Sequence, residues 1–239
     1  MTENSLLSSA SIVFLGHFNP IIMHPQWFNR YKVLPIQETQ KAEGEKPKVI
    51  EIPYEGKKVV LEEASLTSVT AGYAYIPFPS LTIEVTLDRY VCSSTKSENF
   101  NLIKEVTVKT FNILEHTPIK SVGTNFEGHW KCKSSAQDTL KSLFAKDDDS
   151  FKNKFGDEYH IGGAISFQEN GRRVTLRINK SNLLDDGVHF NFNFHKGGLE
   201  AQQAKEAVEI INTNYNDDIN NSIKLAKELI GEPENTWKP

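Results

Sequence analysis

Two histidines and an asparagine stand close together near the N-terminus, in the stretch SIVFLGHFNPIIMHPQWFNRY. His17, Asn19 and His24 supply donors and acceptors that could handle a nucleotide, and Gly-His-Phe-Asn-Pro fits the first part of a nucleotidylyltransferase signature. The second part needs two histidines at the start of a helix, whereas Ile22 and a shifted His24 occupy those places. The rival interpretation is a structural corner, with turns fixed by prolines and with aromatic side chains such as Trp27 buried.

A second polar cluster lies in the last third of the chain, in the stretch HFNFNFH. Side chains alternate along a strand, so His189, Asn191 and Asn193 would share one face while the phenylalanines share the other. That polar face is either solvated surface or a ligand-binding surface. Arg172 and Arg173 form the best local basic patch in the sequence. They could be solvated charges on a hairpin, or they could join the N-terminal histidines in a nucleotide or nucleic-acid site.

No metal, cofactor or catalytic motif is predicted. The 7 histidines show no metal-ligand spacing, and the 2 cysteines, Cys92 and Cys132, are far apart in the sequence. Three consecutive aspartates at 147–149 are typical of a solvated loop. Because the sequence also lacks GxSxG, Walker and GxGxxG patterns, we favour a non-enzymatic protein over an enzyme.

Composition narrows the class of partner. The chain has 239 residues, of which 38% are hydrophobic and 24% charged, which is typical of a globular protein. With 27 basic against 31 acidic residues the net charge is -4, so bulk nucleic-acid binding is disfavoured. No apolar run is long enough for a signal segment or membrane span, and two cysteines suit a reducing compartment, so we expect a cytoplasmic protein.

The strand and helix patterns predict an α+β fold with antiparallel sheets, helices packed on one face, and two similar strand-strand-helix halves. Residues 1–36 would hold a strand and an aromatic corner, and residues 37–48 a mobile loop. Residues 49–130 would form a first antiparallel sheet plus a helix, and residues 131–239 a second sheet plus a long C-terminal helix. Both sheets could also belong to one compact domain.

Two helices are expected, at about 97–115 and 199–230. The second carries an apolar stripe from Ala204 to Ile230, and its Asn-rich middle leaves open whether it is continuous. The stripe is longer than a strand of roughly 20 Å can cover. A second copy of the chain is therefore an expected partner, and burial against the first helix is the alternative.

The segment from helix to strand, LEHTPIKSVGTNF, resembles a sporadically distributed, uncharacterised bacterial family of α+β proteins found near mobile-element or defence genes. The resemblance covers residues 50–230 loosely, and Val122-Gly123-Thr124-Asn125-Phe126 stands where that family has its "lGlnF" strand. Thr124 and the N-terminus depart from the pattern. The resemblance implies an accessory role in a defence or mobile-element system. Together, these observations predict a homo-oligomeric binding or scaffold protein, with a nucleotide- or nucleic-acid-acting enzyme or sensor as the alternative.

Overall fold

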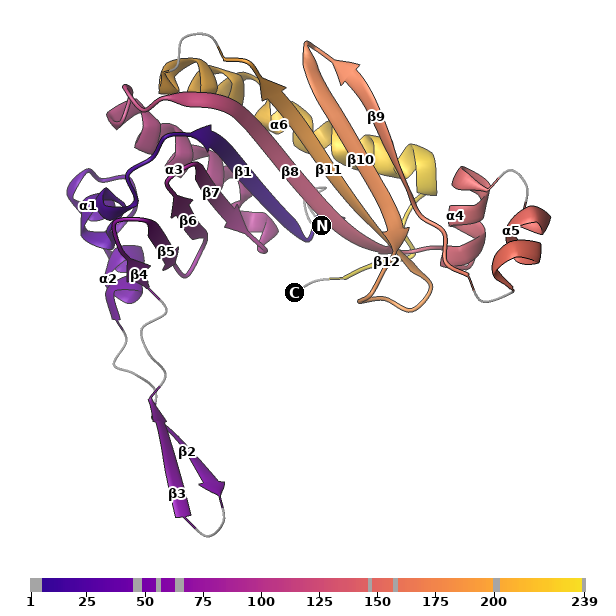
Figure 1. Ribbon diagram of the computed structural model, residues 1–239, viewed down its shortest axis with the longest axis horizontal. Coiled ribbons are helices and arrows are strands. Elements are labelled where there is room, and N and C mark those ends of the chain that lie inside the picture. Colours follow the sequence, from indigo (N-terminus) through magenta and orange to yellow (C-terminus); the bar gives the residue numbers. More distant parts are fainter. Residues whose placement is uncertain are drawn as a thin grey trace.

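One large antiparallel sheet carries most of the chain, and two long helices lie along it (Figure 1). The computed structural model describes residues 6–44, 49–54, 57–62, 67–145, 148–156, 159–199 and 203–237.

Strands β1 and β8 are neighbours near the middle of the sheet, although more than a hundred residues separate them. The strand order is β4 (Ser68–Val69), β5 (Tyr73–Pro77), β6 (Thr82–Thr86), β7 (Arg89–Ser94), β1 (Ser9–Gly16), β8 (Ile119–Lys131), β11 (Gly187–Gly197), β10 (Arg172–Lys180) and β9 (Gly163–Glu169). The remaining strands are β12 (Asn235–Thr236), which pairs with β8, and the separate hairpin of β2 (Val49–Tyr54) and β3 (Lys57–Glu62). All the pairings of the described strands are antiparallel, so the predicted α+β class with a large antiparallel sheet is confirmed.

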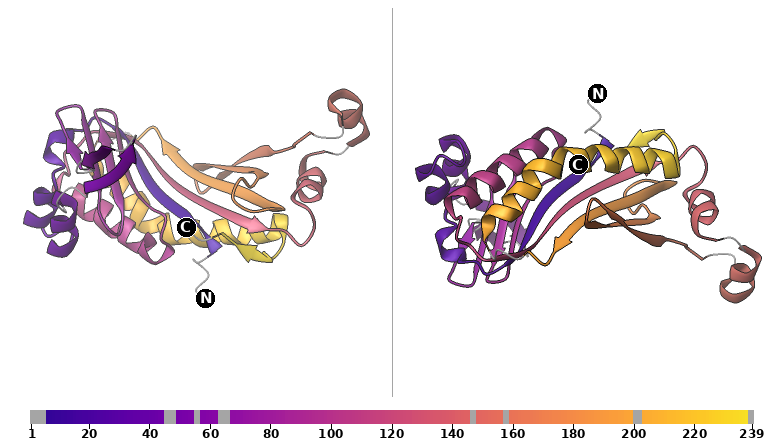
Figure 2. Two further views of the ribbon diagram at one scale, coloured as in Figure 1. Left: turned by 90° about the horizontal axis from the view of Figure 1, so that it is seen from below. Right: turned by 90° about the horizontal axis from the view of Figure 1, so that it is seen from above.

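The helices are α1 (Pro25–Arg30), α2 (Ile36–Gly44), α3 (Phe100–Ile113), α4 (Ala136–Phe144), α5 (Asp148–Phe155) and α6 (Ala204–Ile230), with short 3-10 turns η2 (Pro20–Ile22) and η3 (Ser97–Asn99). Helix α3 contacts β1 and β7, whereas α6 contacts β8, β11 and α3 itself. Figure 2 shows α3 and α6 side by side over one face of the central strands. None of the described helices is long and apolar enough to cross a membrane.

The core lies between these helices and the sheet. Alternate residues of β11, Phe190, Phe192 and Phe194, are fully buried on the helix side, as the period-two pattern predicts. Helix α6 is continuous over 27 residues, and its stripe from Ala204 to Ala226 is buried. Because α3, β8 and β11 contact α6 inside the chain, the stripe gives no reason to expect a second copy on α6.

Two local predictions were wrong. Residues 37–44 form most of α2 rather than a loop, because tertiary contacts stabilise it: Glu38 accepts hydrogen bonds from the backbone and hydroxyl of Ser80. Of the three aspartates expected in a loop, Asp148 and Asp149 begin α5, and the first lies outside the described residues.

Candidate functional site

A row of neutral hydrogen-bonding side chains crosses seven strands on the face of the sheet away from α3 and α6. Cross-strand register places the members of this polar row opposite one another in the order Thr82, Ser93, Ser11, Asn125, Asn193, Thr175 and Ser166. The alternating burial of the strands puts their apolar neighbours on the helix side. We call this surface the polar sheet face.

Hydrogen bonds connect much of the polar row. Asn193 donates from Nδ2 to Oδ1 of Asn125 at 2.6 Å, and Asn125 donates in turn to Oγ of Ser11 at 3.0 Å. The hydroxyls of Ser166 and Thr175 lie 3.1 Å apart. These side chains therefore hold one another in place, which sets the positions of the donors and acceptors on this face.

A second row on the same face contains charges. Asn191 donates to Oε1 of Glu127 at 2.6 Å, and Nε2 of His189 lies 3.7 Å from the other carboxylate oxygen. The interaction with His189 is the largest effect lowering the pKa of Glu127, and it outweighs the opposing effect of burial. The predicted polar residues His189, Asn191 and Asn193 therefore do share one surface, but within a network that β8 completes.

The end of this row is covered by the C-terminal segment. His129 stacks on His189 with ring centroids 4.4 Å apart, and the Trp237 ring meets His129 edge-on at 5.8 Å. Nδ1 of His129 lies 2.9 Å from the hydroxyl of Ser181. Burial, helped by the neighbouring His189, lowers the pKa of His129 to about 4, so this imidazole is neutral at pH 7.

Positive charge on the polar sheet face gathers on β10. Arg173 and Arg177 are both exposed there, two residues before and two residues after Thr175, so they point to the same face as Thr175. Partial burial, together with the charge of Arg173, lowers the pKa of His195 on the neighbouring strand.

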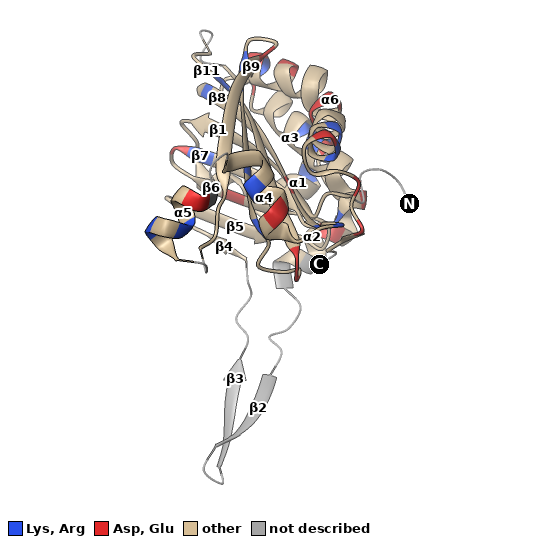
Figure 3. Ribbon diagram, turned by 90° about the vertical axis from the view of Figure 1, so that its right-hand side faces the viewer, with Lys and Arg blue, Asp and Glu red and all other residues tan. Residues whose placement is uncertain are grey.

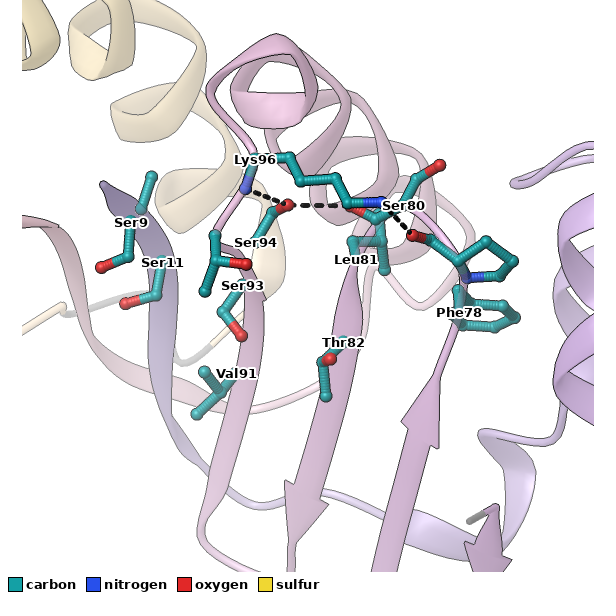
Figure 4. Close-up of a pocket in the computed structure, with 13 residues that line it drawn as sticks. Ser9, Ser11, Phe78, Ser80, Leu81, Thr82, Val91, Ser93, Ser94 and Lys96 are labelled. Carbon is teal, nitrogen blue, oxygen red and sulfur yellow. Dashed lines mark hydrogen bonds between the residues drawn. The ribbon is translucent and has the colours of Figure 1, made fainter. Parts of the chain in front are cut away.

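At the other end of the polar row lies a pocket of about 450 Å³ (Figure 4). Ser9, Ser11 and Ser93 line its sheet side, and Figure 4 shows Lys96 along its rim. The Lys96 ammonium donates to the carbonyl of Pro79 at 3.3 Å. The pocket is rich in hydroxyls and continuous with the polar row, so it belongs to the same candidate site.

Arg172, by contrast, does not belong to this surface. It is 6% exposed on the helix side, and its guanidinium donates to both carboxylate oxygens of the fully buried Asp218, at 2.8 and 2.7 Å. Thr124 donates to the same carboxylate at 2.8 Å, and the Phe194 ring lies 5.5 Å from the guanidinium carbon. The predicted Arg172/Arg173 patch is therefore split between two faces, because consecutive strand residues point in opposite directions.

The N-terminal residues form a different region. His17 and Asn19 line a second cavity of about 460 Å³ beside His116 at the end of α3. His24 accepts a backbone hydrogen bond at 3.4 Å and caps α1. Since β10 lies three strand spacings from β1, roughly 14 Å, the structure does not bring these histidines together with Arg173. Within the described residues, no group of three His, Cys, Asp or Glu side chains could hold a metal ion.

Sequence reasoning missed most of the polar row. Ser11 and Thr175 each lie between two apolar residues, so the direction of their side chains was readable within the strand. Their meeting in one row depends on the pairing of distant strands, which no local pattern encodes. Comparison with known proteins adds no further clue: no protein-family model matches the sequence, and no curated protein matches it.

Proposed function

We propose that this protein is a non-enzymatic binding protein whose polar sheet face binds the surface of another protein. The observation that carries the proposal is the row of polar side chains, joined in part by hydrogen bonds, that runs across seven strands on a face without a covering helix among the described elements. An array of partly exposed donors and acceptors that are already held in position is the kind of surface that a polar partner can complete.

The dimensions favour a macromolecular partner. Seven strands span about 29 Å at about 4.8 Å per spacing, which suits an ordinary interface of about 800 Å² per partner rather than a small molecule. Bases of single-stranded nucleic acid stack on aromatic side chains, and from β6 to β9 the described strands place no Phe, Tyr or Trp on this face. Tyr73 and Tyr75 lie on the same face but only on β5, beyond the end of the polar row. The exposed Arg173 and Arg177 favour a protein surface with some negative charge.

The alternative, a nucleotide- or nucleic-acid-acting enzyme or sensor, has less support. It needs the N-terminal histidines and both hairpin arginines in one site, and Arg172 is engaged by Asp218. We further propose that the binding protein works in a reducing compartment such as the cytoplasm, which two free buried cysteines suit.

We also propose that the chain consists of two similar halves, divided between α3 and β8 rather than after residue 130, where the sequence pattern placed the division. In each, a first strand is followed by two short helices, at least three sheet strands and a long helix. The sheet order supports the division, because β1 and β8 meet at the centre and the other strands of each half extend outward from them.

Site-specific photo-cross-linking in the source cells tests the binding face. A benzophenone amino acid at Thr175 should cross-link one protein reproducibly, whereas the same amino acid at Thr213, exposed on α6, should not. Thr175→Arg should weaken capture of that protein at least tenfold with an unchanged melting temperature, and Thr213→Arg is the matched control. Equal capture by both variants would contradict the proposal. A thermal shift with a small polar compound, abolished by blocking the pocket, would instead favour a small-molecule site.

A further inference from the structure

Strand β9 ends the large sheet and has one exposed edge (Figure 1). Among the described residues, β9 pairs only with β10. Its side chains are half-buried or exposed, and Ile165 is 38% exposed on the helix side, next to the half-buried Phe167. An edge of this kind presents unpaired backbone donors and acceptors to solvent.

The edge lacks the features that usually prevent strands from pairing between molecules. Its sequence, GAISFQ before the final glutamate, contains no proline and no charged residue, and its register with β10 has no bulge. Figure 3, which faces this side, shows β9 without acidic or basic residues along its middle. The opposite end of the sheet is different, because β4 has only two residues and offers little to pair with.

The hairpin turn determines which groups point outward. Asn170 and Gly171 form a two-residue turn with φ of 50° and 70°, so the flanking pair Glu169 and Arg172 is hydrogen-bonded. Hydrogen-bonded and non-hydrogen-bonded pairs alternate along an antiparallel ladder. The backbone N–H and C=O groups of Ala164, Ser166 and Gln168 therefore point away from β10, toward the free edge.

We infer that β9 of one chain pairs antiparallel with β9 of a second copy, about a two-fold axis at Ser166. In this register Ser166 faces its own equivalent, and Ala164 faces Gln168 of the partner subunit, so each outward-pointing backbone group finds a partner. Ile165 then lies beside Phe167 of the partner subunit on the helix side, which buries the exposed apolar surface of both. No like charges meet, since Glu169 faces Gly163 of the partner subunit.

This self-complementarity is the reason to choose a second copy as the occupant rather than an unrelated peptide. A closed two-fold dimer uses the same strand twice and leaves no further edge of β9 free. The two polar sheet faces would become one continuous surface across both chains. The inference does not depend on the proposed function, because a dimer could form whatever the polar sheet face binds.

Disulfide trapping tests the register. The equivalents of Ser166 would have Cα atoms about 5.5 Å apart, which permits a disulfide. Ser166→Cys should therefore form a covalent dimer under mild oxidation, whereas Thr175→Cys, one strand inward on the same face, should stay monomeric. The native cysteines are both buried and should not compete.

Sedimentation velocity tests the association itself. Wild type and Ser166→Ala should shift from the 27.0 kDa monomer toward twice that mass with rising concentration. Ser166→Pro removes an outward N–H without touching the ladder to β10, and Ile165→Lys puts a charge at the apolar contact, so both should remain monomeric with native circular dichroism. A wild type that stays monomeric at hundreds of micromolar, or Cys variants that cross-link equally, would overturn the inference.

Discussion

The buried ion pair between β10 and α6 allows a direct test of what holds the long helix to the sheet. Arg172 and Asp218 form a bidentate pair with side chains 6% and 0% exposed. Asp218→Asn keeps the shape of the side chain and removes its charge, so the guanidinium stays buried without a counter-ion. Removing one partner of a buried pair costs about 3 to 5 kcal/mol, because the remaining charge is not solvated.

The loss should be visible in both chemical and thermal unfolding. At about 2 to 4 °C per kcal/mol for a chain of this size, Asp218→Asn should lower the melting temperature by about 6 to 20 °C. The midpoint of urea unfolding should fall without a change in slope, since the surface exposed on unfolding is the same. Circular dichroism at low temperature should remain native.

Replacing both partners separates the energy of the pair from the cost of an orphaned charge. Arg172→Met combined with Asp218→Leu should be far less destabilising than Asp218→Asn alone, because apolar residues of similar volume need no counter-ion. If the double variant were as unstable as Asp218→Asn alone, the pair would be stabilising in its own right rather than only costly to break. If Asp218→Asn unfolded like wild type, the burial argument would be refuted.

Three smaller changes test other parts of the structure by urea unfolding. The pKa of His129 is lowered to about 4 from 6.5, so the unfolded chain binds a proton at this residue first as the pH falls. The free energy of unfolding of wild type, compared with that of His129→Gln, should therefore be highest above pH 6.5 and fall by about 1 to 2 kcal/mol by pH 4, because the site is partly solvated. Parallel pH profiles of the two proteins would contradict this. The methyl group added by Gly128→Ala would overlap a buried phenylalanine ring of β11, so this variant should lose about 1 to 3 kcal/mol of unfolding free energy. Gly123→Ala should be nearly neutral, because the atoms nearest to its added methyl group lie 3.6 Å away. Equal losses in the two variants would argue against the packing shown. Phe28→Ala should cost about 3 to 5 kcal/mol because that ring is fully buried, and the half-buried Trp27→Ala should cost less, so the reverse order would place Trp27 in the core.

Local patterns in the sequence determined a large part of the fold. The Asn-Gly turn between β9 and β10 is present, with both residues at positive φ. The alternating phenylalanines of β11 are buried, and the three-and-four spacing of apolar residues from Phe100 to Phe111 and from Ala204 to Ala226 does form helices. These features depend on neighbours a few residues apart, so the chain encodes them locally.

The candidate site illustrates both what was readable and what was not. Arg172 shares strand parity with the apolar Val174 and Leu176, so its inward direction was already present in the alternation. Its partner, 46 residues away on α6, was not predictable, because nothing local to either residue selects the other.

The sequence by itself determined the α+β class, the direction of side chains along each strand, and the absence of recognisable catalytic motifs. Only the tertiary structure decided that β1 pairs with β8, that the stripe on α6 is covered within the chain, and that seven polar side chains align in one row. The physical reason is that strand pairing and helix docking join residues far apart in the chain, and their register follows from the packing of the whole core rather than from any short segment.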